Sequence, residues 1–310
     1  MTHAELDAAI AAKDAEKAAT LLAALTAAGD NPRDAKQCSD LINLLAFYRK
    51  NSQAHGAYLQ GKAALGAPAL IGAGLSLNAL LYACCREAAL LEAALALWEE
   101  MATLEVKPDR EPAGKLILAA VAAKKYEEAF GVFLGAIDAG LQPATPVCVA
   151  LVRTAATLPR LAQSAYAVHL SIKASGAALP AEALAQLLSA CVEAGTPEQC
   201  HALYKEFFPS AAGAARATPP PPPSALLRLA LRLASTSSAA AASAAAVLRQ
   251  VRADTPAECA GETARAAYEA TFGALAKSAL SKSNPSLAAS AHAVLTQMRE
   301  LQVRDRGLHK

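Results

Sequence analysis

The chain has 310 residues and a formal net charge of +2, because 29 Lys and Arg residues are balanced by 27 Asp and Glu residues. Alanine makes up roughly a quarter of the sequence, and alanine favours helices and lets them approach closely. Runs of Val, Ile and Thr with a period of two are absent, which argues against strands. The composition therefore predicts an all-α protein.

Charge is unevenly distributed along the chain. Residues 1–208 hold 17 basic and 21 acidic residues, a net charge of −4, whereas residues 209–310 hold 12 and 6, a net charge of +6. This asymmetry predicts that a polyanionic partner is met mainly by the C-terminal third. An ordinary solvated surface is the alternative interpretation.

Cysteine usage and the absence of catalytic motifs narrow the class of protein. The seven cysteines form no C-x-x-C pair and are odd in number, which predicts a reducing compartment with no disulfide framework and no zinc site. The sequence has no glycine-rich phosphate loop, no H-E-x-x-H and no G-x-S-x-G. We therefore expect neither an enzyme nor a cofactor.

The N-terminal region, residues 1–72, is predicted to hold two degenerate helical hairpins. Their helices are expected over residues 2–13 and 15–28, and then over residues 32–48 and 52–65, with Asp14 as an N-cap. The acidic N-terminus lacks the pattern of a transit or signal peptide. The uncharged stretch Ala63–Cys85 is long enough to span a bilayer, but Gly66 and Pro68 interrupt it, so we expect no membrane span.

Residues 73–208 are predicted to form a repeat array. Pro108 and Pro143 are 35 residues apart and close two similar segments, and a period of this length with two helices per unit is typical of stacked helical repeats. We place the third to sixth hairpins at Ser76–Asp109, Arg110–Ala144, Thr145–Pro180 and Ala181–Phe208.

A proline-rich segment separates this array from the C-terminal region. Residues 209–223 cannot continue a helix and are predicted to form an extended linker. Residues 224–310 form a basic region with two more hairpins, over 224–234 and 239–253 and then over 262–278 and 285–302. The chain is thus predicted to be an α-solenoid of about eight stacked antiparallel hairpins.

The third hairpin shows why the units must stack. Each of its two helices has one apolar stripe, and the two stripes are expected to face each other. Neither helix can bury its stripe alone, so neighbouring hairpins must stack. The residues on these stripes are Leu80, Leu81, Cys84 and Cys85 on the first helix and Leu91, Ala94, Leu95 and Trp98 on the second.

The third, fourth and sixth hairpins share short segments of a known repeat pattern. These segments are Asn78–Leu81, Leu95–Met101, Val106–Asp109, Tyr126–Phe130, Gly140–Pro143, Leu187–Gly195 and His201–Phe207. Through them the chain resembles pentatricopeptide repeats over about residues 76–208. Tetratricopeptide repeats are the nearest rival, but their 34-residue period and Trp/Gly/Tyr pattern fit less well.

Members of this family are typically organellar proteins that bind single-stranded RNA with one base per repeat. The resemblance implies that a polar residue early in the first helix and the last residue of the repeat read the base. In the third repeat these reader positions are Asn78 and Asp109, which are predicted to contact an RNA base. The alternative is structural, with Asn78 as a helix-start residue and Asp109 as a turn residue.

The other repeats depart from the family's reading pattern. The fourth has Gly114 and Ala144 at the reader positions, and neither offers a side-chain hydrogen bond. A carboxylate, which repels an RNA backbone, stands where the base would be sandwiched in the fourth and sixth repeats. The first reader position is Val149 in the fifth repeat and Ala185 in the sixth. The carboxylates are those of Glu111 in the fourth repeat and Glu182 in the sixth.

A basic set lies in and after the linker. Two pairs are spaced i,i+4 and i,i+3, so each pair projects from one helix face. Together these guanidiniums are predicted to bind RNA backbone or an acidic protein partner. The residues are Arg216, Arg228, Arg232, Arg249 and Arg252.

The sequence favours a non-catalytic scaffold in an organellar ribonucleoprotein, in particular a subunit of a mitochondrial ribosome. Such a scaffold contacts other protein subunits and RNA backbone without sequence readout, and needs no membrane or small-molecule substrate. A mitochondrion is favoured over a chloroplast. Two alternatives stay open: a free organellar factor that binds single-stranded RNA for maturation or stability, and a protein-interaction adaptor unrelated to RNA.

Overall fold

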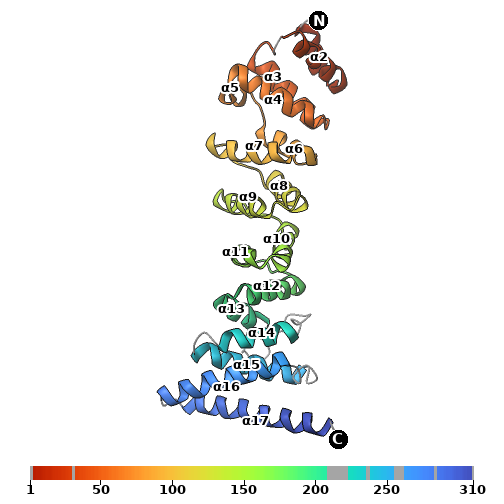
Figure 1. The fold of residues 1–310 in the computed structure, drawn as a ribbon. Helices are drawn as coiled ribbons and strands as arrows, with labels where there is room; N and C mark the ends of the chain where they lie inside the picture. The colour runs from red at the N-terminus through yellow and green to blue at the C-terminus, as the bar shows by residue number, and fades with distance from the viewer. Residues whose placement is uncertain are drawn as a thin grey trace. The chain divides into compact units, whose positions relative to one another are not determined.

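The structure, a computed structural model, describes residues 3–29, 32–207, 223–234, 238–254, 262–282 and 285–308. All regular structure among these residues is helical (Figure 1). The chain divides into two compact units, which we describe separately: unit 1 comprises residues 1–151 and unit 2 residues 152–310. The predicted all-α fold is confirmed.

Unit 1 consists of antiparallel helix pairs joined by short turns. The pairs are α1–α2, α3–α4, α6–α7 and α8–α9, with a short helix, α5, after α4 and a 3-10 turn, η1, before α7. The bounds are α1 His3–Ala11, α2 Ala15–Ala27, α3 Ala35–Phe47, α4 Asn51–Leu65, α5 Ala67–Gly72, α6 Leu77–Cys84, η1 Ala88–Leu90, α7 Leu91–Thr103, α8 Arg110–Ala122 and α9 Tyr126–Asp138.

Unit 2 has the same construction. The division between the units falls inside α10, and a 3-10 turn, η2, lies between α10 and α11 in the chain. The bounds are α10 Thr145–Thr157, η2 Pro159–Leu161, α11 Ala162–Ala174, α12 Ala181–Ala194, α13 Pro197–Phe207, α14 Pro223–Ala234, α15 Ser238–Asp254, α16 Glu262–Lys282 and α17 Pro285–Leu308.

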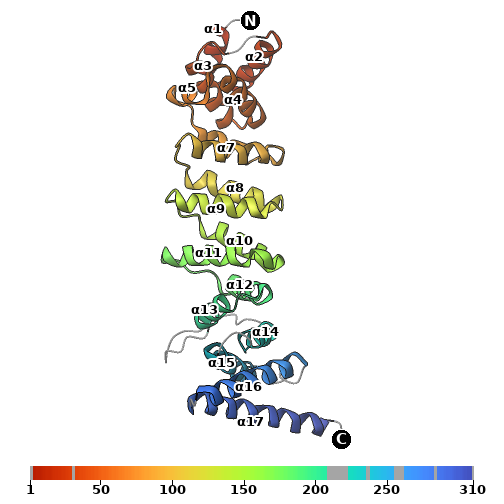
Figure 2. The ribbon, with the colours of Figure 1, turned by 60° about the vertical axis from the view of Figure 1, so that its left-hand side comes forward.

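Within each unit the hairpins follow one another in chain order (Figure 2). The first helices pack successively, α1 on α3, α3 on α6 and α6 on α8 in unit 1, and α12 on α14 and α14 on α16 in unit 2. Hydrogen bonds between consecutive hairpins recur at similar sequence separations, 34 residues for Thr26–Gln60 and 35 for both Ser52–Glu87 and Arg228–Glu193. This recurrence confirms the predicted array of stacked antiparallel hairpins.

Side-chain caps set several helix starts. The Asp14 carboxylate accepts a hydrogen bond from the backbone N–H of Lys17 at 3.0 Å, so its predicted role as an N-cap is confirmed. The Ser76 hydroxyl accepts from the N–H of Ala79 at 3.2 Å in the same way. These caps fix where α2 and α6 begin.

The core of the third hairpin differs from the predicted one on α7. Leu97 and Met101 are 3% and 1% exposed, whereas Trp98 is only half-buried. The difference arises because α7 packs on α8 as well as on α6, which widens its buried stripe. The stripe residues that are buried as predicted are Leu80, Leu81, Cys84, Leu91 and Ala94.

The uncharged stretch Ala63–Cys85 is broken into three helical pieces. Helix α5 was not expected; it begins with a proline in its first turn, and the buried Ser39 hydroxyl donates to the carbonyl of Leu70 at 2.9 Å. No helix in the described part of the chain is long and apolar enough to cross a membrane.

The predicted linker lies outside the described residues, apart from Pro223, which begins α14. The domain boundaries expected at residues 72, 208 and 223 stay predictions.

Gly61 is required where α4 approaches α3. A Cβ atom at this position would lie 2.3 Å from the sulfur of Cys38, which is fully buried, whereas Gly56 on the same helix has nothing within 4 Å. We expect Gly61→Ala to lower the free energy of unfolding by about 1–3 kcal/mol through overpacking. Gly56→Ala should instead raise it by up to about 1 kcal/mol, because alanine favours the helix.

Urea unfolding followed by circular dichroism measures both changes. Cys38→Ala in the Gly61→Ala background should recover part of the loss. Equal stabilisation by the two Gly→Ala changes would refute the close approach.

Candidate nucleic-acid interface

The predicted reader Asn78 is engaged by its own repeat. Its amide Nδ2 donates to the carbonyl of Lys107 at 3.0 Å, and its Oδ1 accepts from the backbone N–H of Asp109 at 2.8 Å. Both ends of the amide therefore hold the loop that leads into α8. The Asp109 carboxylate is exposed and makes no cap bond to α8, so only this half of the pair is free to meet a ligand.

The preceding hairpin contains the same arrangement. Asn43 Nδ2 donates to the carbonyl of Gly74 at 2.9 Å, and Asn43 Oδ1 accepts from the N–H of Ser76 at 3.0 Å. Each asparagine lies on the first helix of one hairpin and holds the loop that leads into the first helix of the next. This repeated arrangement, which we call the asparagine clamp, is the structural role that the sequence left open for Asn78.

The fourth repeat has an apolar hollow at its reader positions. Gly114 and Ala144 line an open pocket of about 270 Å³, together with Val147 and the half-exposed Leu118. Arg110, Glu111 and Lys115 also line this pocket. The hollow can accept an apolar or aromatic group, but its two reader residues offer no side-chain hydrogen bond to a base edge.

In unit 2 the sixth repeat's first reader residue, Ala185, and the residue at its base-sandwiching position, Glu182, are also engaged within the protein. Ala185 is 8% exposed, so it belongs to the core. The Glu182 carboxylate pairs with Arg153 at 3.8 Å.

The predicted basic set is partly neutralised. Arg228 on α14 pairs with Glu193 on α12 at 3.3 Å, and Arg252 on α15 pairs with Glu300 on α17. Arg249 is exposed. Arg216 and the side chain of Arg232 lie outside what the structure describes. The structure therefore does not join these residues into one free basic patch.

Sequence reasoning missed a second set of cations, one at each helix–helix turn of unit 1. Lys13, Arg49, Arg86 and Lys124 each follow the first helix of a hairpin, and all four are exposed. Among the described residues none has a carboxylate partner, although Arg86 lies 5.5 Å from the Tyr82 ring centroid. We call these four residues the turn-edge cations.

Three of these cations adopt a backbone conformation that L-residues avoid. Lys13, Arg49 and Lys124 have φ angles of 56°, 63° and 61°. Positive charge at a helix C-terminus is favoured by the helix dipole, which accounts for the sign of the charge. The dipole does not explain why these three positions hold a long side chain, since glycine would adopt the same φ angle without strain.

A chain of polar contacts joins the successive turns. Glu16 beside the first turn pairs with Lys50 in the second. Glu87 in the third turn accepts from Ser52, close after the second turn, at 2.6 Å. Glu92 pairs with Lys125 in the fourth turn at 2.6 Å, and this bond raises the pKa of Lys125. Because the turns are linked in this way, the turn-edge cations lie along one edge of unit 1.

The signal in the sequence was the spacing of these cations. They lie 36, 37 and 38 residues apart. Lys50 and Lys125, which directly follow two of them, carry the same charge. Only the structure separates the paired lysines from the free cations.

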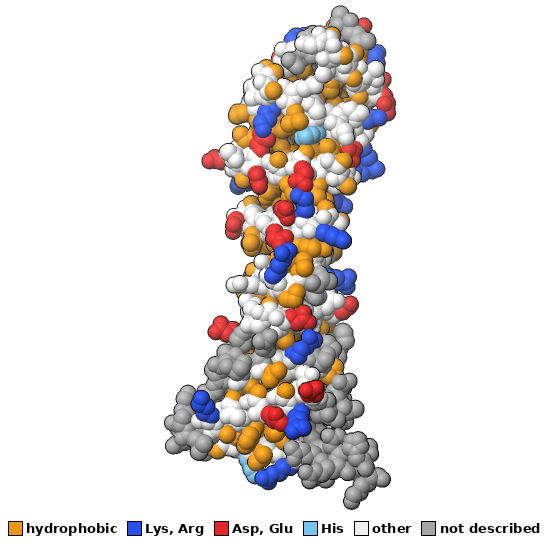
Figure 3. All heavy atoms as spheres, in the orientation of Figure 1, with side chains coloured by type: hydrophobic (Ala, Val, Ile, Leu, Met, Phe, Trp, Pro, Cys, Tyr) orange, Lys and Arg blue, Asp and Glu red, His pale blue; other side chains and the backbone are white. Residues whose placement is uncertain are grey.

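Figure 3 shows basic and acidic side chains interspersed on one face of the molecule. Burial raises the pKa of the Cys38 thiol to about 11 and that of the Cys84 thiol to about 12. No group of three metal-ligating side chains occurs among the described residues. Backbone-type contact with a polyanion is the chemistry that the turn edge supports.

Comparison with known proteins adds structural neighbours only. No protein-family model and no curated protein match the chain. Among solved structures, it is similar to the pentatricopeptide repeat protein PPR10 in complex with an 18-nt psaJ RNA element, with 17% identity and a TM-score of 0.39 over 95% of this chain and 37% of that one. A structure of PPR10 from maize has 16% identity and a TM-score of 0.32 over 93% and 43%. The chain spans less than half the length of these proteins.

The class of the protein is defined by its own packing: it is an all-α helical-repeat protein built from stacked antiparallel hairpins. Hydrogen bonds between its consecutive hairpins recur at separations of 34 and 35 residues.

The asparagine clamp predicts matched effects of two substitutions. Asn43→Ala and Asn78→Ala each remove two exposed hydrogen bonds, so each should lower the free energy of unfolding by about 1–2 kcal/mol. Neither should change the relative affinity for RNA oligonucleotides of different sequence. Chemical unfolding and fluorescence anisotropy measure the two effects. Loss of base selectivity in Asn78→Ala alone would restore Asn78 as a reader.

Proposed function

We propose that the protein is a non-catalytic helical-repeat scaffold that binds single-stranded RNA through its phosphate backbone without reading the base sequence. The observation that carries this proposal is the row of unpaired turn-edge cations. They stand on adjacent turns, whereas the neighbouring lysines Lys50 and Lys125 are neutralised by glutamates. A row of free cations at regular intervals suits a polymer with regularly spaced negative charges.

The reader positions support the part of the proposal that concerns sequence. The Asn78 amide is bonded at both ends within the protein. Gly114 and Ala144 line an apolar hollow, and Ala185 is buried. A good bidentate base contact contributes about 1–3 kcal/mol of discrimination, and none of these residues can supply one. Binding that remains is electrostatic, and it favours no sequence.

The strength of such binding can be bounded. For single-stranded nucleic acid the slope of log K against log salt is about −0.7 per phosphate contact, so four contacts give a slope of about −3. Binding of this kind is weak at physiological salt. A protein that binds RNA this weakly needs contacts with other proteins as well to stay in a ribonucleoprotein particle. Weak binding therefore favours a scaffold over a free RNA-maturation factor.

We also propose, from the sequence resemblance alone, that the particle is organellar and in particular a mitochondrial ribosome. Co-sedimentation of the tagged full chain with mitochondrial ribosomal particles at moderate salt is the expected result. Its recovery only in fractions free of ribosomes would reject this assignment and leave the RNA-binding proposal intact.

Glycine substitutions test the turn edge without unfolding the protein. The triple variant Lys13→Gly, Arg49→Gly and Lys124→Gly removes three charges at left-handed positions, where glycine relieves about 1 kcal/mol of strain per residue. It should be as stable as the parent or more stable. Its salt slope for a labelled oligonucleotide should become less negative by about 2.

The control variant is Lys36→Gln with Lys62→Gln, two cations that are paired with Asp40 and Glu100. It should leave the salt slope nearly unchanged. Nanomolar, sequence-selective binding by the isolated chain at physiological salt contradicts the proposal. So does a triple variant that binds like the parent.

A further inference from the structure

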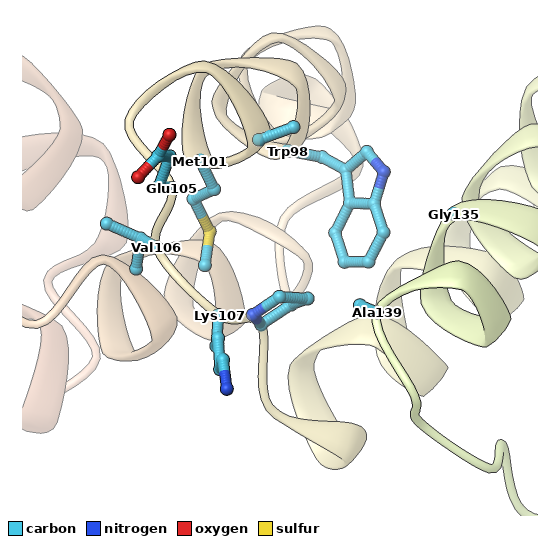
Figure 4. Close-up of a pocket in the computed structure, with 9 residues that line it drawn as sticks. Trp98, Met101, Glu105, Val106, Lys107, Gly135 and Ala139 are labelled. Atoms are coloured by element: carbon cyan, nitrogen blue, oxygen red, sulfur yellow. The ribbon is translucent and has the colours of Figure 1, made fainter.

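Unit 1 has a second pocket, at the edge opposite the turn-edge cations. It lies where α7 and α9 end, against the loop that follows α7, and its volume is about 240 Å³. Figure 4 shows the Trp98 indole on one side of Met101 and Glu105 on the other, with Gly135 and Ala139 of α9 nearby. The typical ligand pocket holds about 300–1,000 Å³, so this one suits a single side chain better than a whole cofactor.

The pocket exists because α9 has a glycine opposite the indole. A Cβ atom at Gly135 would lie 3.5 Å from the Cζ2 and Nε1 atoms of Trp98, so even an alanine would touch the ring. Trp98 is consequently half-buried, with Met101 beneath it fully in the core. The indole N–H has no hydrogen-bond partner within the described part of the chain.

Glu105, which lines the pocket, is unfavourable at its position for two reasons: its backbone conformation and its negative charge. It has a φ of 55° and caps the C-terminus of α7, with its N–H bonded to the carbonyl of Ala102. The same hydrogen-bond position after α9 and α11 is occupied by Gly140 and Gly176, with φ of 78° and 75°. A left-handed conformation strains a side chain, and a helix C-terminus repels a carboxylate.

The Glu105 carboxylate also has no cationic partner among the residues that the structure describes. Figure 4 shows the Lys107 ammonium pointing away from the indole. The exposed Asp138 lies next to Ala139 of the pocket wall in the sequence. A strained, unpaired carboxylate that lines the same pocket as a half-buried aromatic ring is the kind of local cost that accompanies a binding site.

We propose that this pocket receives an arginine side chain from a basic protein partner. The aliphatic stem of arginine packs on the Trp98 indole, and the guanidinium pairs with the Glu105 carboxylate. Arginine fits because it combines an apolar stem with a planar, weakly hydrated cation that stacks on aromatic rings. RNA does not fit, because its phosphates are repelled by Glu105 and Asp138.

The pocket and the turn-edge cations lie at opposite ends of α7, which has 13 residues. A helix of this length spans about 20 Å, so a protein at one edge leaves the other edge open to RNA. The pocket adds a class of partner to the proposed scaffold, and it does not depend on RNA binding.

Trp98 is the only tryptophan in the chain, so its fluorescence reports on this pocket directly. We would titrate the full-length protein with an octa-arginine peptide at physiological salt. The emission of Trp98 should change as peptide is added and approach a plateau. We expect a dissociation constant of about 1 mM or lower, so at least half of the protein is bound at about 1 mM peptide. An oligouridine should leave the emission unchanged, whether or not it binds the turn edge.

Two variants locate the interaction. Glu105→Gly should weaken peptide binding at least tenfold while it raises Tm by roughly 2–4 °C, because it removes both the strain and the repelled charge. Gly135→Leu should fill the pocket and abolish the fluorescence response. Gly131→Leu is the matched control, because Gly131 lies on the same helix, is exposed and has nothing within 4 Å.

Three results would overturn the proposal. They are no emission change with the parent protein, equal affinity in Glu105→Gly, and a full response in Gly135→Leu. RNA binding is measured separately by anisotropy, so failure here does not reject the proposed scaffold, and failure of RNA binding does not reject the pocket.

Discussion

Each hairpin in this protein has an apolar stripe that it cannot bury by itself, and every other property of the fold depends on stacking in register. Burial of aliphatic side chains supplies the free energy, as the fully buried Leu80 and Leu81 illustrate. Burial alone does not fix the register of two alanine-rich helices. The polar links Glu16–Lys50, Ser52–Glu87 and Glu92–Lys125 occur at the same end of the hairpins. Exposed pairs of this kind contribute little stability, about 0–1 kcal/mol each, so their main effect is to align successive turns.

This alignment gives the two edges of unit 1 different chemistry. The edge with the helix–helix turns carries cations that the protein leaves unpaired. The other edge carries the asparagine clamps, the apolar hollow and the Trp98 pocket with its lone carboxylate. A polyanion and a basic protein segment can therefore be held at opposite ends of the same helices. In the scaffold that we propose, this separation keeps the RNA and the basic protein partner from competing for one surface.

The sequence was sufficient for the parts of the fold that local rules decide. Prolines, glycines and caps such as Asp14 placed most hairpins, and the 35-residue period indicated stacking. Helix α5 was missed because Gly66 and Pro68 read as a break, although a proline is tolerated in a first turn.

The site was less predictable, because pairing is a property of tertiary structure. Arg252 looked free in the sequence, but its partner Glu300 is 48 residues away. Asn78 looked like a reader because its residue type suits one, and nothing local shows that its amide is already bonded. The free turn-edge cations and the paired lysines beside them carry the same charge, so the sequence alone could not distinguish them.

The asparagine clamp also bears on how the array comes apart. Asn43 and Asn78 each tie one hairpin to the loop that begins the next, so opening one hairpin exposes hydrogen bonds of its neighbour. In a quasi-one-dimensional protein such ties raise the coupling between adjacent repeats. The two clamps together join the second, third and fourth hairpins. Under mechanical load these three hairpins would thus yield together, as one block, instead of one after another.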